Sequence, residues 1–327
     1  MDSPVTSTAE LAGDGGADAP AAPVFLDVQA LLERSQPRQY PRLFWYVLGV
    51  MLLAVMLSTY LGQQGRGMQI FVELMSGLVM IGLMVGMAAV TYVMAGRQRA
   101  EVKQLEAVEE LVQLRRWPQA AVALEGLLSA PTRTPHARVQ ALIYLTSVLA
   151  RYHRFEEAIA VQNYLLENVR MDAGTEYAIR LGRAMAMLRE DHLVDADRAF
   201  GVLRRMAAAG GDAEASAADG SGGRGPGRES AGLALLEIYR DVKTGHPAEA
   251  VEIFEQRLAA LRDQLGHRVA DAYALAAKAY DLLGRDGEAR AAYEKATLLS
   301  PADELRRRYP EIQSLATKYR AAEAPAA

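Results

Sequence analysis

The sequence predicts an all-α protein in which a two-helix transmembrane hairpin is followed by an α-solenoid of about five helix pairs and a C-terminal capping helix. Three observations support this prediction. Two uncharged apolar runs lie close together near the start of the chain, and the rest is rich in Ala and large apolar residues at helical spacing. A small residue also recurs near the start of every second expected helix, which is typical of stacked helix pairs.

The overall composition excludes several classes of protein. Hydrophobic residues make up 51% of the protein while the mean hydropathy is only -0.01, so the apolar residues are concentrated locally. A formal net charge of -4 and a pI of about 5.8 argue against a general nucleic-acid binder, which needs a basic surplus to meet phosphates. The sequence has no Cys, which excludes disulfides, thiolate metal sites and Cys nucleophiles.

Two segments precede the first apolar run. Residues 1–23 are mainly small and polar, so they cannot bury enough apolar surface to offset the entropy of ordering, and we expect them to be disordered. In residues 24–42, Phe25, Val28 and Leu32 follow helical spacing. This spacing predicts a juxtamembrane amphipathic segment with a short helix near the membrane surface.

The two uncharged runs predict a transmembrane hairpin over residues 43–95. Neither Leu43 to Leu61 nor Leu74 to Met94 carries a charge, and about 20 such residues in a helix cross the ~30 Å hydrocarbon core of a bilayer. We expect helices over 43–61 and 70–95, joined by a short Gly-rich turn and therefore antiparallel. Buried core helices are the disfavoured alternative, and a cleaved signal peptide is disfavoured because the second run would stop transfer.

Small residues on both expected membrane helices are candidates for close helix packing. Ala54, Ser58 and Gly62 lie at a spacing of four on the first helix, and Gly82 and Gly86 form a GxxxG motif on the second. Such positions let helix backbones approach closely in lipid. We expect packing within the hairpin, and the alternative is dimerisation of two copies through the GxxxG motif.

Basic residues around the runs predict the orientation of the hairpin. The outer flanks of the two runs carry most of the nearby positive charge: Arg34, Arg38, Arg42, Arg97, Arg99 and Lys103. The turn between the runs carries only Arg66. Because cytoplasmic flanks carry the excess of Lys and Arg, we expect a multi-pass protein of the inner membrane with both termini in the cytoplasm.

Residues 96–320 contain a repeated unit, which is clearest from Ala272 to Pro301. In this unit aromatic residues stand at Tyr273, Tyr280 and Tyr293, and a Gly at position 284 divides two helical stretches. The pattern resembles the tetratricopeptide repeat (TPR) family, whose units of about 34 residues form two antiparallel helices. The same register finds five small residues that open the second helix of a unit: Ala120, Ala158, Ala196, Ala250 and Ala289.

The third and fourth units are further apart than the others. Residues 207–230 are rich in Ala, Gly, Ser and Asp, and this composition predicts a flexible insertion. After Pro301, the stretches 303–309 and 311–320 have a polar face, and we expect them to form a cap over the last apolar face. Residues 321–327 are expected to be a free tail.

The sequence has no signature of an active site. Its five histidines are not part of an HExxH motif, and neither a G-x-S-x-G elbow nor a P-loop occurs. The sequence therefore predicts no catalytic, cofactor-binding or metal-binding residue, and no enzyme. An enzyme with an unrecognised site is the least supported hypothesis.

The TPR resemblance implies protein binding, because stacked helix pairs form a concave surface lined by the first helix of each unit. Carried over by register, this surface presents Arg151, Arg189 and Lys243 at equivalent positions, with Lys278 nearby. Such a basic stripe would hold an acidic segment or the C-terminus of a partner through charge-assisted hydrogen bonds. The alternative is an ordinary solvated Arg face.

We therefore expect a membrane-anchored scaffold or adaptor that binds protein partners through its concave surface on the cytoplasmic side. The expected partners are other proteins and the lipid bilayer, without nucleic acid, and a homo-oligomer through the hairpin is a further option. The alternative is a regulatory or structural subunit of an oligomeric membrane transport or secretion complex. The hairpin has no intramembrane charge pair or Pro-broken helix, which argues against conduction.

Overall fold

The computed structural model describes residues 26–36, 49, 52–53, 56, 66–132, 134–216 and 230–323. In these residues every regular element is a helix and no strand occurs, so the all-α prediction is confirmed. In sequence order the elements are α1 (Val28–Arg34), α3 (Arg66–Gln113), α4 (Trp117–Leu128), α5 (Pro135–Arg151), α6 (Phe155–Asn168), α7 (Ala173–Arg189), α8 (Leu193–Ser216), α9 (Ala231–Thr244), α10 (Pro247–Leu265), η1 (Gly266–Arg268), α11 (Val269–Leu282), α12 (Asp286–Leu299), α13 (Ala302–Arg308), η2 (Pro310–Ile312) and α14 (Gln313–Glu323).

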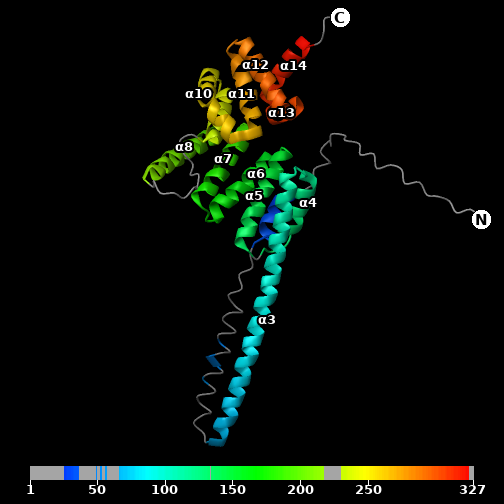
Figure 1. The fold of residues 1–327 in the computed structure, drawn as a ribbon, viewed down its shortest axis with the longest axis vertical. Coiled ribbons are helices and arrows are strands. Elements are labelled where there is room, and N and C mark those ends of the chain that lie inside the picture. Colours follow the sequence, from blue (N-terminus) through cyan, green and yellow to red (C-terminus); the bar gives the residue numbers. More distant parts are fainter. Residues whose placement is uncertain are drawn as a thin grey trace, which may run out of the picture.

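The helices from α3 to α12 form consecutive pairs that stack in sequence order into a solenoid (Figure 1). The second helices of these pairs are α4, α6, α8, α10 and α12, and each begins where the small-residue register predicts. The five small residues are all buried, with at most 2% of their surface exposed: Ala120, Ala158, Ala196, Ala250 and Ala289. Small side chains at these positions let the two helices of a pair approach closely.

The same turn joins the two helices of each described pair. Its central residue has a positive φ between 58° and 79° in every case: Arg115, His153, Asp191, Gly245 and Gly284. The next residue donates its N–H to a carbonyl five positions earlier, over 2.8 to 2.9 Å, as from Arg154 to Leu149. This hydrogen bond is typical of a Schellman turn, which ends a helix through one left-handed residue. The repeat is therefore visible in the backbone as well as in the side chains.

One helix, α3, is much longer than the others. It runs without a break over 48 residues, or about 72 Å at the usual rise per residue. Its C-terminal end packs against α4 and α5, while its N-terminal half projects away from the solenoid (Figure 1). The expected second membrane helix and the first helix of the first pair are thus one helix, and the expected boundary after residue 95 lies inside it.

The projecting half of α3 exposes large apolar side chains: Ile81, Met84, Val85, Met87, Tyr92, Val93 and Met94. In the described part of the protein, no helix combines the length and the apolar character that crossing a membrane requires. Of the first expected membrane helix, 43–61, only positions 49, 52, 53 and 56 belong to the described residues. The transmembrane hairpin therefore stays a prediction.

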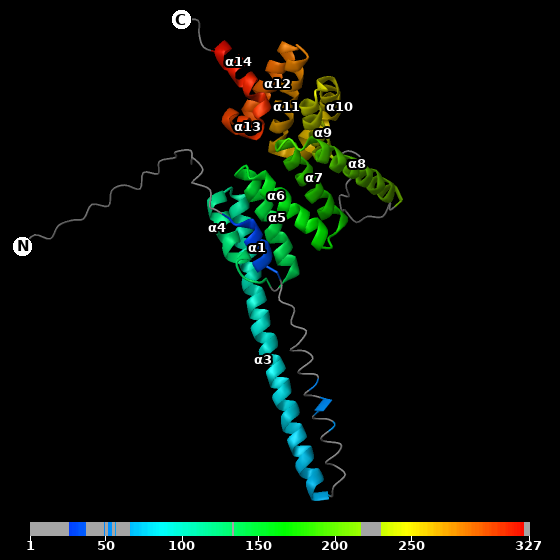
Figure 2. The ribbon, with the colours of Figure 1, turned by 180° about the vertical axis from the view of Figure 1, so that it is seen from behind.

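The short helix α1 forms where the helical spacing predicts, and its apolar face packs against the solenoid. Leu26, Val28 and Leu31 are buried in one apolar cluster with residues of α4, α5 and α6, and α1 lies beside α4 (Figure 2). The buried Arg138 fixes this segment, because its Nε donates to Ser35 Oγ over 3.0 Å. The solenoid thus covers the apolar face of α1, and the position of this helix near a membrane stays a prediction.

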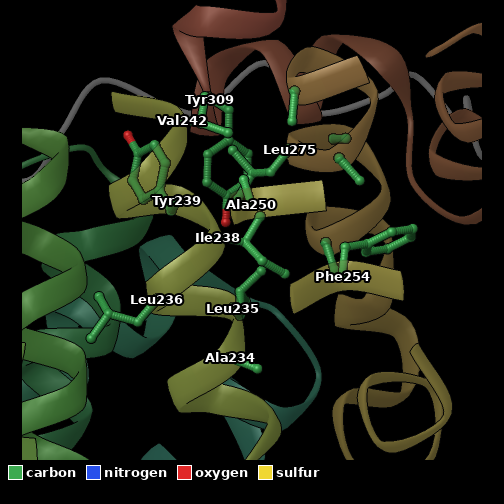
Figure 3. Packing of buried hydrophobic residues seen from close by; sticks show 14 of the residues in the cluster. Ala234, Leu235, Leu236, Ile238, Tyr239, Val242, Ala250, Phe254, Leu275 and Tyr309 are labelled. Atoms are coloured by element: carbon green, nitrogen blue, oxygen red, sulfur yellow. The ribbon is translucent and has the colours of Figure 1, made fainter. Parts of the chain in front are cut away.

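The C-terminal half of the solenoid and the cap share one apolar core. Side chains from α7 to α14 contribute to it. Figure 3 shows Tyr239 of α9, Phe254 of α10, Leu275 of α11 and Tyr309 of the cap within this core. The rings of Tyr239 and Tyr309 meet edge to face with 5.2 Å between their centroids. Tyr309 is fully buried there, so the segment after α12 is part of this core.

Two expected boundaries differ from the structure. Helix α8 continues to Ser216, so the beginning of the expected insertion is helical, and Ala207 is buried. The run of Ala residues after Met206 explains this extension, because Ala has the highest helix propensity. The rest of the insertion, 217–229, lies outside the described residues. Helix α14 ends at Glu323, inside the expected tail.

Candidate binding pocket

A cavity of about 450 Å³ lies where the C-terminal ends of α3, α5 and α7 face η1, α11 and α13. It is lined by residues from both ends of the solenoid: Val112, Gln113, Arg115, Trp117, Ser147, Ala150, Arg151, His153, Arg189, His267, Arg268, Asp271, Glu304 and Arg308. The curvature of the solenoid brings the cap close to the second helix pair. Residues from several helix pairs and from the cap thus line the cavity together, and no single pair supplies all of them.

Repeated positions form one wall of the pocket. Gln113, Arg151 and Arg189 are the last residues of α3, α5 and α7, each four residues before the helix that follows. The left-handed turn residues Arg115 and His153 come next in the first two pairs. Because the same turn recurs, equivalent side chains project into the same space from neighbouring pairs. Part of their positive charge also balances the negative ends of the helix dipoles.

The two carboxylates of the pocket are held by arginines. Arg308 donates to Asp271 and to Glu304 over 2.5 Å each. Glu304 also accepts from Arg151 over 2.9 Å, and Arg268 lies 3.8 Å from the buried Asp271. These pairs connect α5, α11 and α13, so they fix the cap against the inner face of the solenoid.

Arg189 has a different environment from the paired arginines. Its guanidinium carbon lies 4.9 Å from the ring centroid of Phe155 and 5.5 Å from that of Tyr309. Cation–π contacts of this kind stabilise the guanidinium charge. The Nε of Arg189 is buried and has no hydrogen-bond partner among the described residues.

Two groups of the pocket, His153 and Glu304, have lowered pKa values, to which nearby arginine charges contribute. Partial burial, then the charges of Arg189, Arg151, Arg307 and Arg308, lower the pKa of the His153 imidazole. Burial opposes ionisation of Glu304, but the hydrogen bond from Arg308 and the nearby arginine charges outweigh it and lower the pKa of this carboxyl. The site therefore favours the neutral imidazole of His153 and the ionised carboxylate of Glu304.

The structure divides the basic stripe that the sequence predicts. Arg151 and Arg189 both line the pocket. Lys243 instead lies 2.9 Å from Glu311 of η2 and 2.5 Å from Asp191. Lys278 donates to Ser314 of α14 over 3.1 Å. The protein's own cap thus covers the C-terminal half of the stripe, and only the arginine end faces an open cavity.

Sequence reasoning missed five basic residues of the pocket: Arg115, His153, His267, Arg268 and Arg308. The first two could have been found from the repeat register, because each stands two residues before the second helix of its pair. Arg268 and Arg308 carry no local signal, since only the curvature of the solenoid brings them to this place.

The expected sites for helix packing in the membrane remain untested. Ala54, Ser58 and Gly62 lie outside the described residues. On α3, a Cβ atom added at Gly82 or Gly86 would meet no described heavy atom within 4 Å. In the described residues there is also no group of three or more His, Asp or Glu side chains that could hold a metal ion.

Comparisons with known proteins give no match: no family model, no curated protein and no solved structure matches the sequence.

Proposed function

We propose that this protein is a membrane-attached adaptor of the inner membrane, in which a hairpin over residues 43–95 holds a TPR-like solenoid on the cytoplasmic side. The solenoid binds partner proteins and performs no catalysis. The proposal explains why a single protein has both a projecting apolar helix and a curved stack of helix pairs.

The observation that carries this proposal is the continuity of α3. One end of this helix exposes large apolar side chains, and the other end is the first helix of the solenoid. Exposed apolar surface that is contiguous along a helix is unfavourable in water and marks an interaction site. From Leu74 to Met94 the helix also has no charge, so lipid is a suitable environment for this stretch.

The open end of the basic stripe supports the binding of acidic protein segments. Arg115 and Arg151 line the pocket from the first and second pairs, together with Arg189 of the third pair. Guanidinium groups match carboxylates in a planar, two-point geometry. The membrane anchor would raise the local concentration of the groove, so weak contacts with partners suffice.

Membrane attachment can be tested by fractionating cells that express the full-length protein. The wild type should stay in the membrane pellet after alkaline carbonate washing, and a variant with Ile81→Lys and Val85→Lys should move to the supernatant. A matched variant with Val122→Lys and Val194→Lys, which changes exposed apolar residues of the solenoid, should stay in the pellet. A wild type found in the supernatant would refute the anchor.

The orientation can be tested with a single cysteine, because the sequence has none. A Val194→Cys variant places a thiol at an exposed position of α8. In spheroplasts, a membrane-impermeant maleimide should label it only after the inner membrane is permeabilised. Labelling of intact spheroplasts would place the solenoid on the opposite side.

Partner binding can be tested by crosslinking in native membranes. A variant with Arg115→Glu and Arg151→Glu should lose a captured partner that the wild type retains. Arg198→Glu is the control, because Arg198 lies on α8 outside the pocket. A partner retained equally by both variants would exclude the arginine end of the groove as its binding site.

An oligomeric subunit is the second candidate function, and the open space around Gly82 and Gly86 favours it. A second α3 could pack against this face of the helix. A Gly82→Cys variant should then form disulfide-linked dimers in membranes, while Met84→Cys, on a different face, should not. Equal amounts of dimer from both variants would indicate random collision.

A further inference from the structure

The binding pocket contains more positive charge than its own carboxylates can balance. Five arginines and two carboxylates line it, which leaves a formal surplus of three positive charges when its histidines are neutral. The ion pairs with Asp271 and Glu304 involve Arg151, Arg268 and Arg308. Arg115 and Arg189 also line the cavity and are outside these ion pairs.

The cavity has the size of a small-molecule site. Its volume of about 450 Å³ falls within the usual range for ligand pockets. An extended peptide would need a continuous path along the stripe, but Glu311 and Ser314 of the cap already contact Lys243 and Lys278. The compact space beside Trp117 is what remains open.

We propose that this pocket binds a small phosphorylated molecule, with Arg115 and Arg189 as the main contacts of its phosphate groups. A single carboxylate would balance only one of the surplus charges, whereas a phosphate monoester or diphosphate balances two or three. Its several oxygens also accept from guanidinium groups on different helices at once. Trp117 offers a flat apolar surface to the rest of the ligand.

The Glu304 carboxylate would compete with the phosphate groups of this ligand for the arginines of the pocket. Its carboxylate holds Arg151 and Arg308 at the edge of the cavity and contributes negative charge there. A bound phosphate would share these arginines or displace the carboxylate. Removing the Glu304 charge should therefore strengthen binding, and this direction cannot result from misfolding.

This inference goes beyond the adaptor role, since it concerns the purified protein without any protein partner. The ligand and an acidic partner would nevertheless compete for the same arginines. The experiments can refute either proposal without the other, because ligand binding is measured on the purified protein and partner capture is measured in membranes.

The test uses Trp117 as a reporter. The protein has two tryptophans, so Trp45→Phe leaves one in the pocket. In this background, the full-length protein in detergent is titrated with pyrophosphate, with ADP and with citrate at constant ionic strength. Saturable fluorescence changes are expected with the two phosphate probes, and citrate should bind about tenfold more weakly or not at all.

Variants then locate the site. Arg115→Gln and Arg189→Gln should each weaken pyrophosphate binding about tenfold or more, as expected for the loss of a charge-assisted hydrogen bond. Arg198→Gln, outside the pocket, should bind like the parent, and Glu304→Gln should bind severalfold more tightly. Citrate bound as well as pyrophosphate would refute the phosphate class. No saturable change, or unchanged affinity in Glu304→Gln and both pocket arginine variants, would refute the site.

Discussion

Arg151 on α5 and Glu304 on α13 form an ion pair of 2.9 Å although 153 residues separate them in the sequence. This pair connects the second helix pair to the cap across the inner face of the solenoid. It also sets one edge of the binding pocket. A contact of this kind reports on whether the curvature of the solenoid persists in solution.

The energetic coupling between Arg151 and Glu304 should be modest. The side chains are 41% and 23% exposed, and ion pairs in such surroundings contribute about 0.5 kcal/mol, at most about 1 kcal/mol. A double-mutant cycle of Arg151→Gln and Glu304→Gln, measured by urea unfolding of the full-length protein in detergent, should give this coupling energy. The coupling should shrink in high salt. A coupling of zero at low salt would mean that this ion pair does not contribute to the stability of the folded protein.

Tyr309 should contribute far more to stability than this ion pair. It is fully buried against Tyr239, and truncating a large aromatic residue in a core costs about 3–5 kcal/mol. We therefore expect Tyr309→Ala to lower the free energy of unfolding by that amount. Tyr309→Phe should be neutral or slightly stabilising, because the buried hydroxyl makes no well-formed hydrogen bond among the described residues. A large loss in the Phe variant would reveal a partner for that hydroxyl.

Glycines at different backbone positions should respond to alanine with opposite signs. Gly245 is the left-handed residue of the fourth turn, with φ at 79°, and a Cβ there would meet no described atom within 4 Å. Gly245→Ala should thus cost about 1–2 kcal/mol through backbone strain alone. Gly126 lies within α4 and has equal space, so Gly126→Ala should stabilise by about 0.4–1 kcal/mol. Thermal unfolding of both variants checks this pair, and the same sign for both would contradict the turn geometry.

His153 should make stability depend on pH in the mildly acidic range. Its pKa is lowered in the folded protein relative to the ordinary value of 6.5, so the unfolded protein binds more protons as the pH falls through 6.5. The free energy of unfolding should therefore decrease from pH 7.5 to pH 5.5. His153→Asn removes this titration while tolerating the positive φ at this position. The variant should lose less stability than the wild type over this interval, and equal losses would contradict the lowered pKa.

Arg138 should hold α1 in place. This buried guanidinium donates to Ser35 Oγ over 3.0 Å and to the Leu32 carbonyl and the Tyr164 hydroxyl over 2.9 Å each. Replacing it by Met removes these charge-assisted bonds and should cost at least about 2 kcal/mol. Trypsin should then cleave faster after Arg34, which is the last residue of α1. Hydrogen exchange of α1 that is unchanged in Arg138→Met would show that apolar packing alone holds it.

Much of the solenoid could be predicted from the sequence, because its rules are local. Ala158 and Ala289 open their helices where the register places them, and Pro301 precedes the cap as expected. The turn at His153 was harder to predict, since a left-handed residue is expected to be Gly, as it is at position 284. His is among the few residues other than Gly that adopt this conformation more often than most, so a search for Gly alone misses the turn.

The pocket could be predicted only in part. Arg151 and Arg189 follow from the register, but Arg308 reaches them only because the solenoid curves and the cap returns to α5. This curvature is the sum of small rotations between pairs, and no short pattern encodes it. The position of α1 also depends on a distant contact. Its apolar face alone does not distinguish lipid from protein, and Arg138, which donates to Ser35, lies 103 residues further along the sequence.

The unbroken path of α3 from its apolar end to the first helix pair has a mechanical consequence. A helix without a hinge transmits rotation about its own axis, so the direction in which the pocket opens is fixed by the helical phase between the two ends. Each residue inserted or deleted near positions 97–103 would turn the solenoid by about 100° and shift it by about 1.5 Å. Four added residues would bring the pocket back to nearly its original direction relative to the apolar end of α3. Two added residues would turn it to almost the opposite direction. The number of residues in this helix thus sets the direction in which the pocket opens relative to the apolar end. A change of about one full helical turn leaves this direction nearly unchanged.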